Sequence, residues 1–127
     1  MNYRQKVGKF GETLARDYLR RHGYEIIKTN LKVSYKEIDI IACRGRFVVF
    51  IEVKTRTSSA YGSADENLDS KKIDNLKKAL NHYFYLNDNK LFNQEIDLNY
   101  VRIDLIAVDI NRRKKIAKIK HYKDVAW

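Results

Sequence analysis

Cysteine, proline and glycine are all scarce in this chain. Its 127 residues include one cysteine (Cys43), no proline and five glycines. A lone cysteine excludes an internal disulfide framework and a cysteine-rich zinc site. No stretch approaches the roughly 20 apolar residues that cross a bilayer, and neither a signal peptide nor a linker is recognisable. We therefore expect a single cytoplasmic domain over residues 1–127, with no membrane partner.

Positive charge is what the chain has in excess. The 26 Lys and Arg residues outnumber the 16 Asp and Glu residues, which gives a formal net charge of +10 and a sequence pI near 9.7. A small basic domain attracts polyanions. Nucleic acid is therefore the first partner to expect, ahead of an anionic membrane surface, for which the sequence offers no amphipathic segment.

The hydrophobic pattern predicts an α/β domain. Apolar residues at helical spacing indicate one helix over 3–22, stopped by Gly23. They indicate a second helix that opens at Leu68-Asp69, with Asp69 or Ser70 as its cap, and ends at Asn87. Short runs rich in β-branched residues indicate five strands, over 24–29, 37–44, 46–55, 100–109 and 115–121. We expect a mixed sheet of about five strands with a helix on either side, in which 46–55 is central because it is apolar on both faces.

Two pairs of charged residues fall on the predicted hairpin of 37–44 and 46–55. Glu37 and Asp39 share one face of the first strand, and Glu52 and Lys54 share one face of the second. With Arg44 and Gly45 as the two-residue turn, Asp39 would face Phe50, and Glu52 would be its diagonal neighbour on the same face. The alternative is that these acids are ordinary solvent-facing residues.

Adjacent carboxylates repel one another, and a divalent cation relieves that repulsion. Oxygen ligands suit Mg²⁺ or Mn²⁺, and Mg²⁺ needs only one or two protein carboxylates. A lysine two residues beyond such a ligand, as Lys54 is beyond Glu52, could orient an attacking water or stabilise charge on a phosphoryl group. These parts together suit metal-assisted phosphodiester hydrolysis.

The same run of residues resembles a known nuclease core. Glu37-Ile38-Asp39, followed after twelve residues by Glu52-Val53-Lys54, resembles the Asp…Glu-x-Lys core of the PD-(D/E)XK nuclease superfamily. An ordered series along nearly the whole chain is similar to the YraN family, small bacterial endonuclease-like proteins related in fold to archaeal Holliday-junction resolvases. The series comprises Gly8, Gly11, Glu12, Ala15, Leu19, Gly23, Tyr24, Asn30, 37–41, 50–56, Tyr61, Gly62, Lys72 and 102–104.

The resemblance implies a restriction-endonuclease-like fold and roles for the matching residues. Asp39 and Glu52 would be metal ligands, with the Val53 carbonyl as a third oxygen. Lys54 would be the catalytic lysine.

Two further residues gain a role only through this resemblance. Glu12 matches the helical acid that often completes such sites, and Lys72 lies where many members carry another polar active-site residue. The chain departs from the family's usual pattern at Lys36, where glycine is common, and from the superfamily's at Ile38, where proline is common. Neither departure removes a ligand.

Several polar residues are candidates to hold a phosphate backbone. They lie just beyond Lys54, at the start of the second helix and at the turn before the last strand. They are Arg56, Thr57, Lys71, Lys72, Arg112 and Arg113. A solvated helix face and an edge strand protected by lysines are the alternative readings of these charges.

The function that these observations favour is a Mg²⁺- or Mn²⁺-dependent nuclease acting on DNA. Branched or single-stranded DNA is favoured over a specific duplex sequence, because nothing resembles a base-reading recognition helix. The likeness to junction resolvases makes a homodimer an expected partner arrangement. The alternative is a non-enzymatic nucleic-acid-binding module that keeps the nuclease fold.

Overall fold

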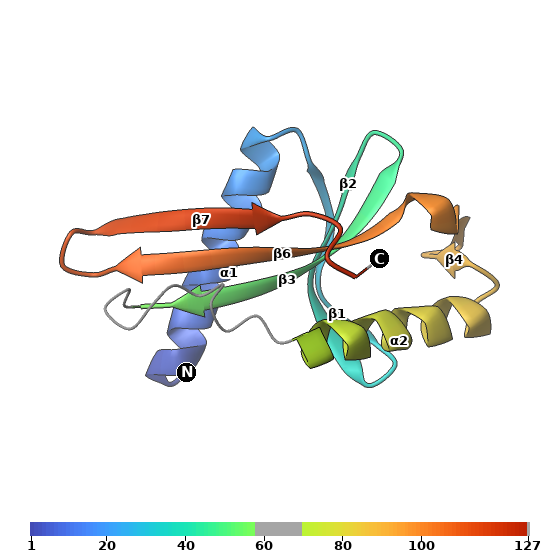
Figure 1. The fold of residues 1–127 in the computed structure, drawn as a ribbon, viewed down its shortest axis with the longest axis horizontal. Helices are drawn as coiled ribbons and strands as arrows, with labels where there is room; N and C mark the ends of the chain where they lie inside the picture. The colour runs from blue at the N-terminus through green and yellow to red at the C-terminus, as the bar shows by residue number, and fades with distance from the viewer. Residues whose placement is uncertain (58–69, 127) are drawn as a thin grey trace.

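The structure is a computed structural model that describes residues 1–57 and 70–126. Two long helices and five long strands make up most of it (Figure 1). In chain order the elements are α1 (Tyr3–Arg21), β1 (Glu25–Val33), β2 (Lys36–Arg44), β3 (Phe47–Arg56), α2 (Ser70–Leu86), β4 (Lys90–Leu91), β5 (Gln94–Glu95), the 3₁₀ turn η2 (Leu98–Tyr100), β6 (Val101–Asn111) and β7 (Ile116–Tyr122). Neither helix is both long and apolar enough to cross a membrane within this described part of the chain.

The five long strands form one mixed sheet in the order β1-β2-β3-β6-β7. Neighbours are antiparallel except β3 and β6, which run parallel. The two run side by side toward one end of the molecule in Figure 1, and α2 provides the long connection that a parallel pair requires. β3 is therefore central and β7 lies at an edge, as the sequence predicts. The short β4–β5 hairpin, which the sequence did not predict, stands apart.

Each face of the sheet is covered by one helix. Leu19 of α1 packs with Ile40, Ile51 and Ile106 on one side. On the other side α2 packs a separate core, which holds Phe50, Leu76, Leu80, Phe84 and Ile103. Two helices on opposite faces of a mixed five-stranded sheet are consistent with the restriction-endonuclease-like fold expected from the resemblance.

Local signals explain where α1 begins and ends. The Asn2 side chain accepts a hydrogen bond from the Gln5 amide at 2.9 Å, and the Gln5 side chain accepts one from the Asn2 amide at 3.0 Å. This reciprocal pair satisfies two amides at the start of the helix. At the other end Gly23 has φ +85°, a conformation that glycine adopts without a Cβ clash.

The register of the β2–β3 hairpin differs by two residues from the predicted one. Arg44 pairs with Phe47, so the two-residue turn is Gly45-Arg46 and not Arg44-Gly45. Phe50 therefore faces Ile41, and the prediction that it faces Asp39 is wrong. Gly45, at φ +57°, accounts for the shift, since the turn needs its left-handed residue at that position. A shift of two residues keeps each side chain on its predicted face.

A buried polar network ties β6 to three other segments. Asp104, with no exposed surface, receives two bonds of 2.9 Å from the Arg102 guanidinium, and His121 Nε2 lies 2.7 Å from its carboxylate. The Asp124 amide donates to the same carboxylate at 2.9 Å, and Arg102 also donates to the Tyr24 hydroxyl at 2.8 Å. The cluster joins Tyr24, directly before β1, and the C-terminal tail to the sheet.

Candidate active site

The candidate site lies at a fork between two strands. The pairing of β2 with β3 extends from the turn only as far as Ile40 and Ile51, although both strands continue beyond these residues. In Figure 1 β3 follows β6, whereas the β1–β2 hairpin bends toward the start of α2. The Glu52 carboxylate lies close enough to Asp39 to disfavour the charged form of the Asp39 carboxyl. The hairpin thus brings the two predicted acids to one place.

The backbone of β3 holds the Asp39 side chain in the fork. The Val53 amide donates a hydrogen bond to Asp39 Oδ2 at 2.8 Å. Val53 therefore contacts Asp39 directly through its amide, whereas the family resemblance implies a role only for its carbonyl oxygen. That carbonyl's role as a third oxygen ligand stays a prediction.

Glu52 is almost completely buried, with 9% of its surface exposed. Lys72, in the first turn of α2, places its ammonium 2.5 Å from Glu52 Oε1. The second helix thus places the positively charged Lys72 side chain against Glu52 of the central strand. The contact joins two residues that the sequence singled out and that lie twenty positions apart.

Burial and neighbouring charge hold the Asp39 carboxyl partly protonated at neutral pH. Loss of hydration is the larger cause, and the Glu52 carboxylate adds to it. The Val53 amide and the more distant Lys72 act in the opposite sense, and the net result raises the pKa of Asp39 from 3.8 to about 7. A cation between the acids would remove this penalty, because it favours both charged forms.

Glu12 approaches the same acids from α1. Burial raises the pKa of Glu12, and of the neighbouring carboxylates Glu37 contributes more than Glu52. With its amide oriented so that nitrogen faces the acids, Asn30 donates to Glu12 at 3.1 Å and to Glu37 at 3.2 Å. Asn30 had no role assigned from the sequence. Only the tertiary fold brings its strand against α1, so local patterning could not reveal this contact.

A glycine next to Glu12 fixes the position of α1 over the sheet. A Cβ placed on Gly11 would collide with the Thr55 hydroxyl oxygen. The helix can therefore lie directly on β3 only because residue 11 has no side chain. This close approach positions Glu12 beside the fork.

Glu12 and Asp39 line a groove of about 650 Å³ that runs along the N-terminal half of α1. Its remaining walls come from the first turns of α1 and from the end of β3. They are formed by Tyr3, Arg4, Val7, Gly8, Val53, Thr55, Arg56 and Thr57. Lys54 is half-buried, and strand alternation puts it on the face of Glu52.

The candidate phosphate-binding residues are divided between two places. Arg56 and Thr57 line the groove, and Arg112 donates to the Tyr3 hydroxyl at 2.7 Å beside it. Lys71 is exposed next to Lys72, and Arg113 is exposed on the β6–β7 turn. The adjoining Ser58, Ser59 and Tyr61 lie outside the described residues.

The donor set fits a hard divalent cation only in part. Within 1–57 and 70–126 no three His, Cys, Asp or Glu side chains are arranged to hold a metal ion by themselves. Two carboxylates with water and a backbone oxygen are a coordination that Mg²⁺ accepts. The residues present therefore fit an ion that keeps part of its hydration shell.

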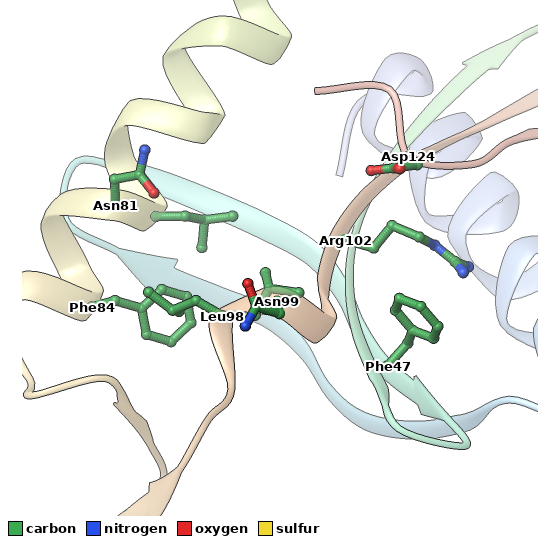
Figure 2. A pocket seen from close by; sticks show the side chains of 9 residues that line it. Phe47, Asn81, Phe84, Leu98, Asn99, Arg102 and Asp124 are labelled. Carbon is green, nitrogen blue, oxygen red and sulfur yellow. The ribbon is translucent and has the colours of Figure 1, made fainter. Parts of the chain in front are cut away.

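A second cavity, of about 370 Å³, opens away from this site (Figure 2). It lies where α2, η2 and the starts of β3 and β6 meet, with Phe84 and Leu98 on one side and Phe47 on another. Its described lining contains none of the predicted site residues. It has no paired acids and carries none of the proposed chemistry.

Comparison with known proteins places the chain in a bacterial family. The model of a family described as "Uncharacterised protein family UPF0102" matches residues 11–108. A UPF0102 protein of Caldicellulosiruptor bescii is 38% identical over 126 residues, which is 98% of each chain. Another, of Flavobacterium psychrophilum, is 41% identical over 121 residues, 95% of this chain and 93% of its own. The chain therefore belongs to the UPF0102 family, and the predicted YraN resemblance is confirmed.

Proposed function

We propose that this UPF0102 protein is a nuclease that hydrolyses DNA phosphodiester bonds with Mg²⁺ or Mn²⁺. The observation that carries the proposal is the pair of acids at the β2–β3 fork. In a basic protein, burial and the nearby Glu52 carboxylate together raise the pKa of Asp39 to about 7. Folding concentrates negative charge here at a cost, which a bound cation would offset.

Asp39, Glu52 and the Val53 carbonyl would hold the cation. When bound, the cation would supply a more acidic water and neutralise charge that develops on the phosphoryl oxygens. The Val53 amide already fixes Asp39 for that task. Glu12, on the groove wall beside Asp39, would bind a water of the ion's hydration shell.

Two lysines would act on the phosphate and on the water. Lys54, on the Glu52 face of β3, would orient the attacking water and stabilise the negative charge of the transition state. Lys72 contacts Glu52 at 2.5 Å and would move to a phosphate oxygen when the cation takes its place on the carboxylate. Arg56, Thr57, Lys71, Arg112 and Arg113 would hold the flanking backbone.

A cleavage assay tests the proposed function. Wild type, Lys54→Ala and the control Lys78→Ala would be incubated with labelled duplex, single-stranded, flap and four-way-junction DNA, in Mg²⁺, Mn²⁺ or EDTA. Lys78 is exposed on α2 and pairs with Asp74, so its removal costs the same charge away from the fork. We expect metal-dependent cleavage of branched or single-stranded DNA that Lys78→Ala retains and Lys54→Ala loses by at least about 100-fold. Equal cleavage by all three proteins would contradict the assigned site.

One observation favours a second candidate, a nucleic-acid-binding module without catalysis. Lys72 already neutralises Glu52, so this acid has a partner before any cation binds. Salt-sensitive DNA binding with no cleavage in either metal would favour that function.

A further inference from the structure

Gly8 of α1 lines the groove, and no contact within the described part of the chain requires a glycine at this position. Gly8 lies in the interior of α1 and lines the groove, and a Cβ added to it would meet nothing within 4 Å among residues 1–57 and 70–126. Gly11, three residues later, is required by the contact with Thr55. A glycine inside a helix costs about 0.5–1 kcal/mol relative to alanine. With respect to the described residues, the missing side chain of Gly8 leaves open space in the groove.

The groove changes character along its length. Its lining includes the acids Glu12 and Asp39 and also Arg4, Arg56 and Tyr3. Tyr3 and Arg4 begin α1 and mark what we call the outer end, whereas Glu12, more than two turns further along the helix, marks the inner end. A smaller hollow of about 270 Å³ continues it and shares Tyr3, Val7 and Thr57 with it. The acids would hold a cation that contacts one phosphodiester, and the guanidinium groups would bind phosphates further along the same DNA strand. The lining of the groove thus suits a DNA backbone that extends from the cation site.

Tyr3 supplies an aromatic surface at the outer end. Its hydroxyl accepts a hydrogen bond from Arg112 at 2.7 Å, and the Arg112 guanidinium carbon lies 5.2 Å from the ring centroid. The ring is thus fixed by a cation, yet Tyr3 remains 52% exposed. A fixed, exposed ring is a stacking surface for a base, and a duplex hides its base faces in its own stack.

The spacing suits a short run of nucleotides. Tyr3 and Glu12 are nine residues apart on one helix, a rise of about 13–14 Å. A stacked strand rises about 3.4 Å per nucleotide along its axis, so roughly four stacked nucleotides span the distance between Tyr3 and Glu12.

We propose that this groove binds an unpaired DNA strand beside the fork, with the backbone passing over Gly8 and a base stacked on Tyr3. This inference rests on the proposed nuclease function and deepens it, because it names DNA with an unpaired strand next to the cleaved bond as the substrate class.

Binding without cleavage tests the inference separately from catalysis. The affinity of the full chain for labelled oligothymidylate of about 12 nucleotides and for a duplex of the same length would be measured by fluorescence anisotropy in EDTA. The variants are Gly8→Leu, Gly8→Ala and Tyr3→Ala. The matched controls are Thr13→Leu, exposed on the same helix, and Tyr85→Ala, an 81% exposed tyrosine on α2.

We expect Gly8→Leu and Tyr3→Ala each to weaken single-strand binding by roughly tenfold and to change duplex binding by less than about twofold. Gly8→Ala should have a smaller effect in the same direction, and both controls should bind as wild type does. The unfolding midpoint of Gly8→Leu should equal or exceed that of wild type, since leucine favours the helix.

Unchanged single-strand affinity in Gly8→Leu and Tyr3→Ala would overturn the inference even if the wild type cleaves DNA. So would an equal loss on duplex and single strand. Conversely, selective loss of single-strand binding with no cleavage in either metal would retain the groove as a strand-binding site and refute the nuclease function.

Discussion

At the scale of the residue, the candidate site depends on a carboxyl group that folding disfavours. The pKa of Asp39 rises from 3.8 to about 7, chiefly through burial and then through Glu52. Between these two values the folded protein binds more protons than the unfolded chain. The contribution of Asp39 to the free energy of unfolding therefore falls as pH rises from about 4 to 7 and stays low above that. At pH 8 the charge of Asp39 lowers the stability of the fold, so a structural role of this charge does not explain its presence in the fork.

Replacement of Asp39 by asparagine should stabilise the protein in alkaline solution. Asparagine keeps an oxygen for the Val53 amide but carries no charge beside Glu52. We expect Asp39→Asn to raise the free energy of unfolding by about 1–4 kcal/mol at pH 8 and by progressively less toward pH 5. Urea denaturation at several pH values without metal measures the difference. A variant less stable than wild type at pH 8 would show that the Asp39 charge is already compensated.

At the scale of the element, the buried network on β6 holds the C-terminal tail and Tyr24, directly before β1, to the sheet. Burial alone would raise the pKa of Asp104, but bonds from His121, Arg102 and the Asp124 amide outweigh it and lower that pKa. The stability that the Asp104 charge provides is therefore present above its unfolded pKa and is lost as pH falls through the lowered value. The network supports the sheet from a position separate from the fork.

Neutralising Asp104 should therefore destabilise the fold without altering the candidate site. We expect Asp104→Asn to lower the free energy of unfolding at pH 7 by about 3–5 kcal/mol, because Arg102 would be left without its charged partner. Asp88→Asn is the control, since Asp88 is exposed at φ +52°, which asparagine tolerates, and should change stability by less than about 0.5 kcal/mol. Urea unfolding compares the two. Equal effects would show that the network contributes little.

The elements were predicted where the sequence carries a local signal. The end of α1 at Gly23 and the central position of β3 follow from a glycine cap and from a run that is apolar on both faces. The hairpin register was missed because either of two adjacent residue pairs around Gly45 could form the turn. The β4–β5 hairpin was missed because two-residue strands carry no hydrophobic pattern.

The candidate site was predictable only in part, for a similar reason. Asp39 and Glu52 could be placed together because one short turn connects their strands. The contacts of Lys72 with Glu52 and of Asn30 with Glu12 join segments that meet only in the folded chain. The family resemblance indicated Lys72 as a site residue, but the sequence did not indicate that its partner is Glu52.

At the scale of the whole molecule, charge is distributed unevenly. The chain carries a formal charge of +10, yet Glu12, Glu37, Asp39 and Glu52 interact with one another near the fork. The overall excess of positive charge attracts a polyanion, whereas the acids near the fork would repel its phosphates. A cation held between the acids reconciles the two, because it reverses the sign of the charge that a phosphate meets.

The most direct measurement of this account is a calorimetric titration of the intact protein with Mn²⁺ near pH 7, in buffers of different ionisation enthalpy. We expect Mn²⁺ binding to release up to about one proton and to strengthen as pH rises toward 8. Binding should be lost in Glu52→Gln and retained in Glu95→Gln, a change at an exposed glutamate of β5. Equal Mn²⁺ binding by both variants, or no binding by wild type at millimolar Mn²⁺, would contradict the assignment of the fork as a cation site.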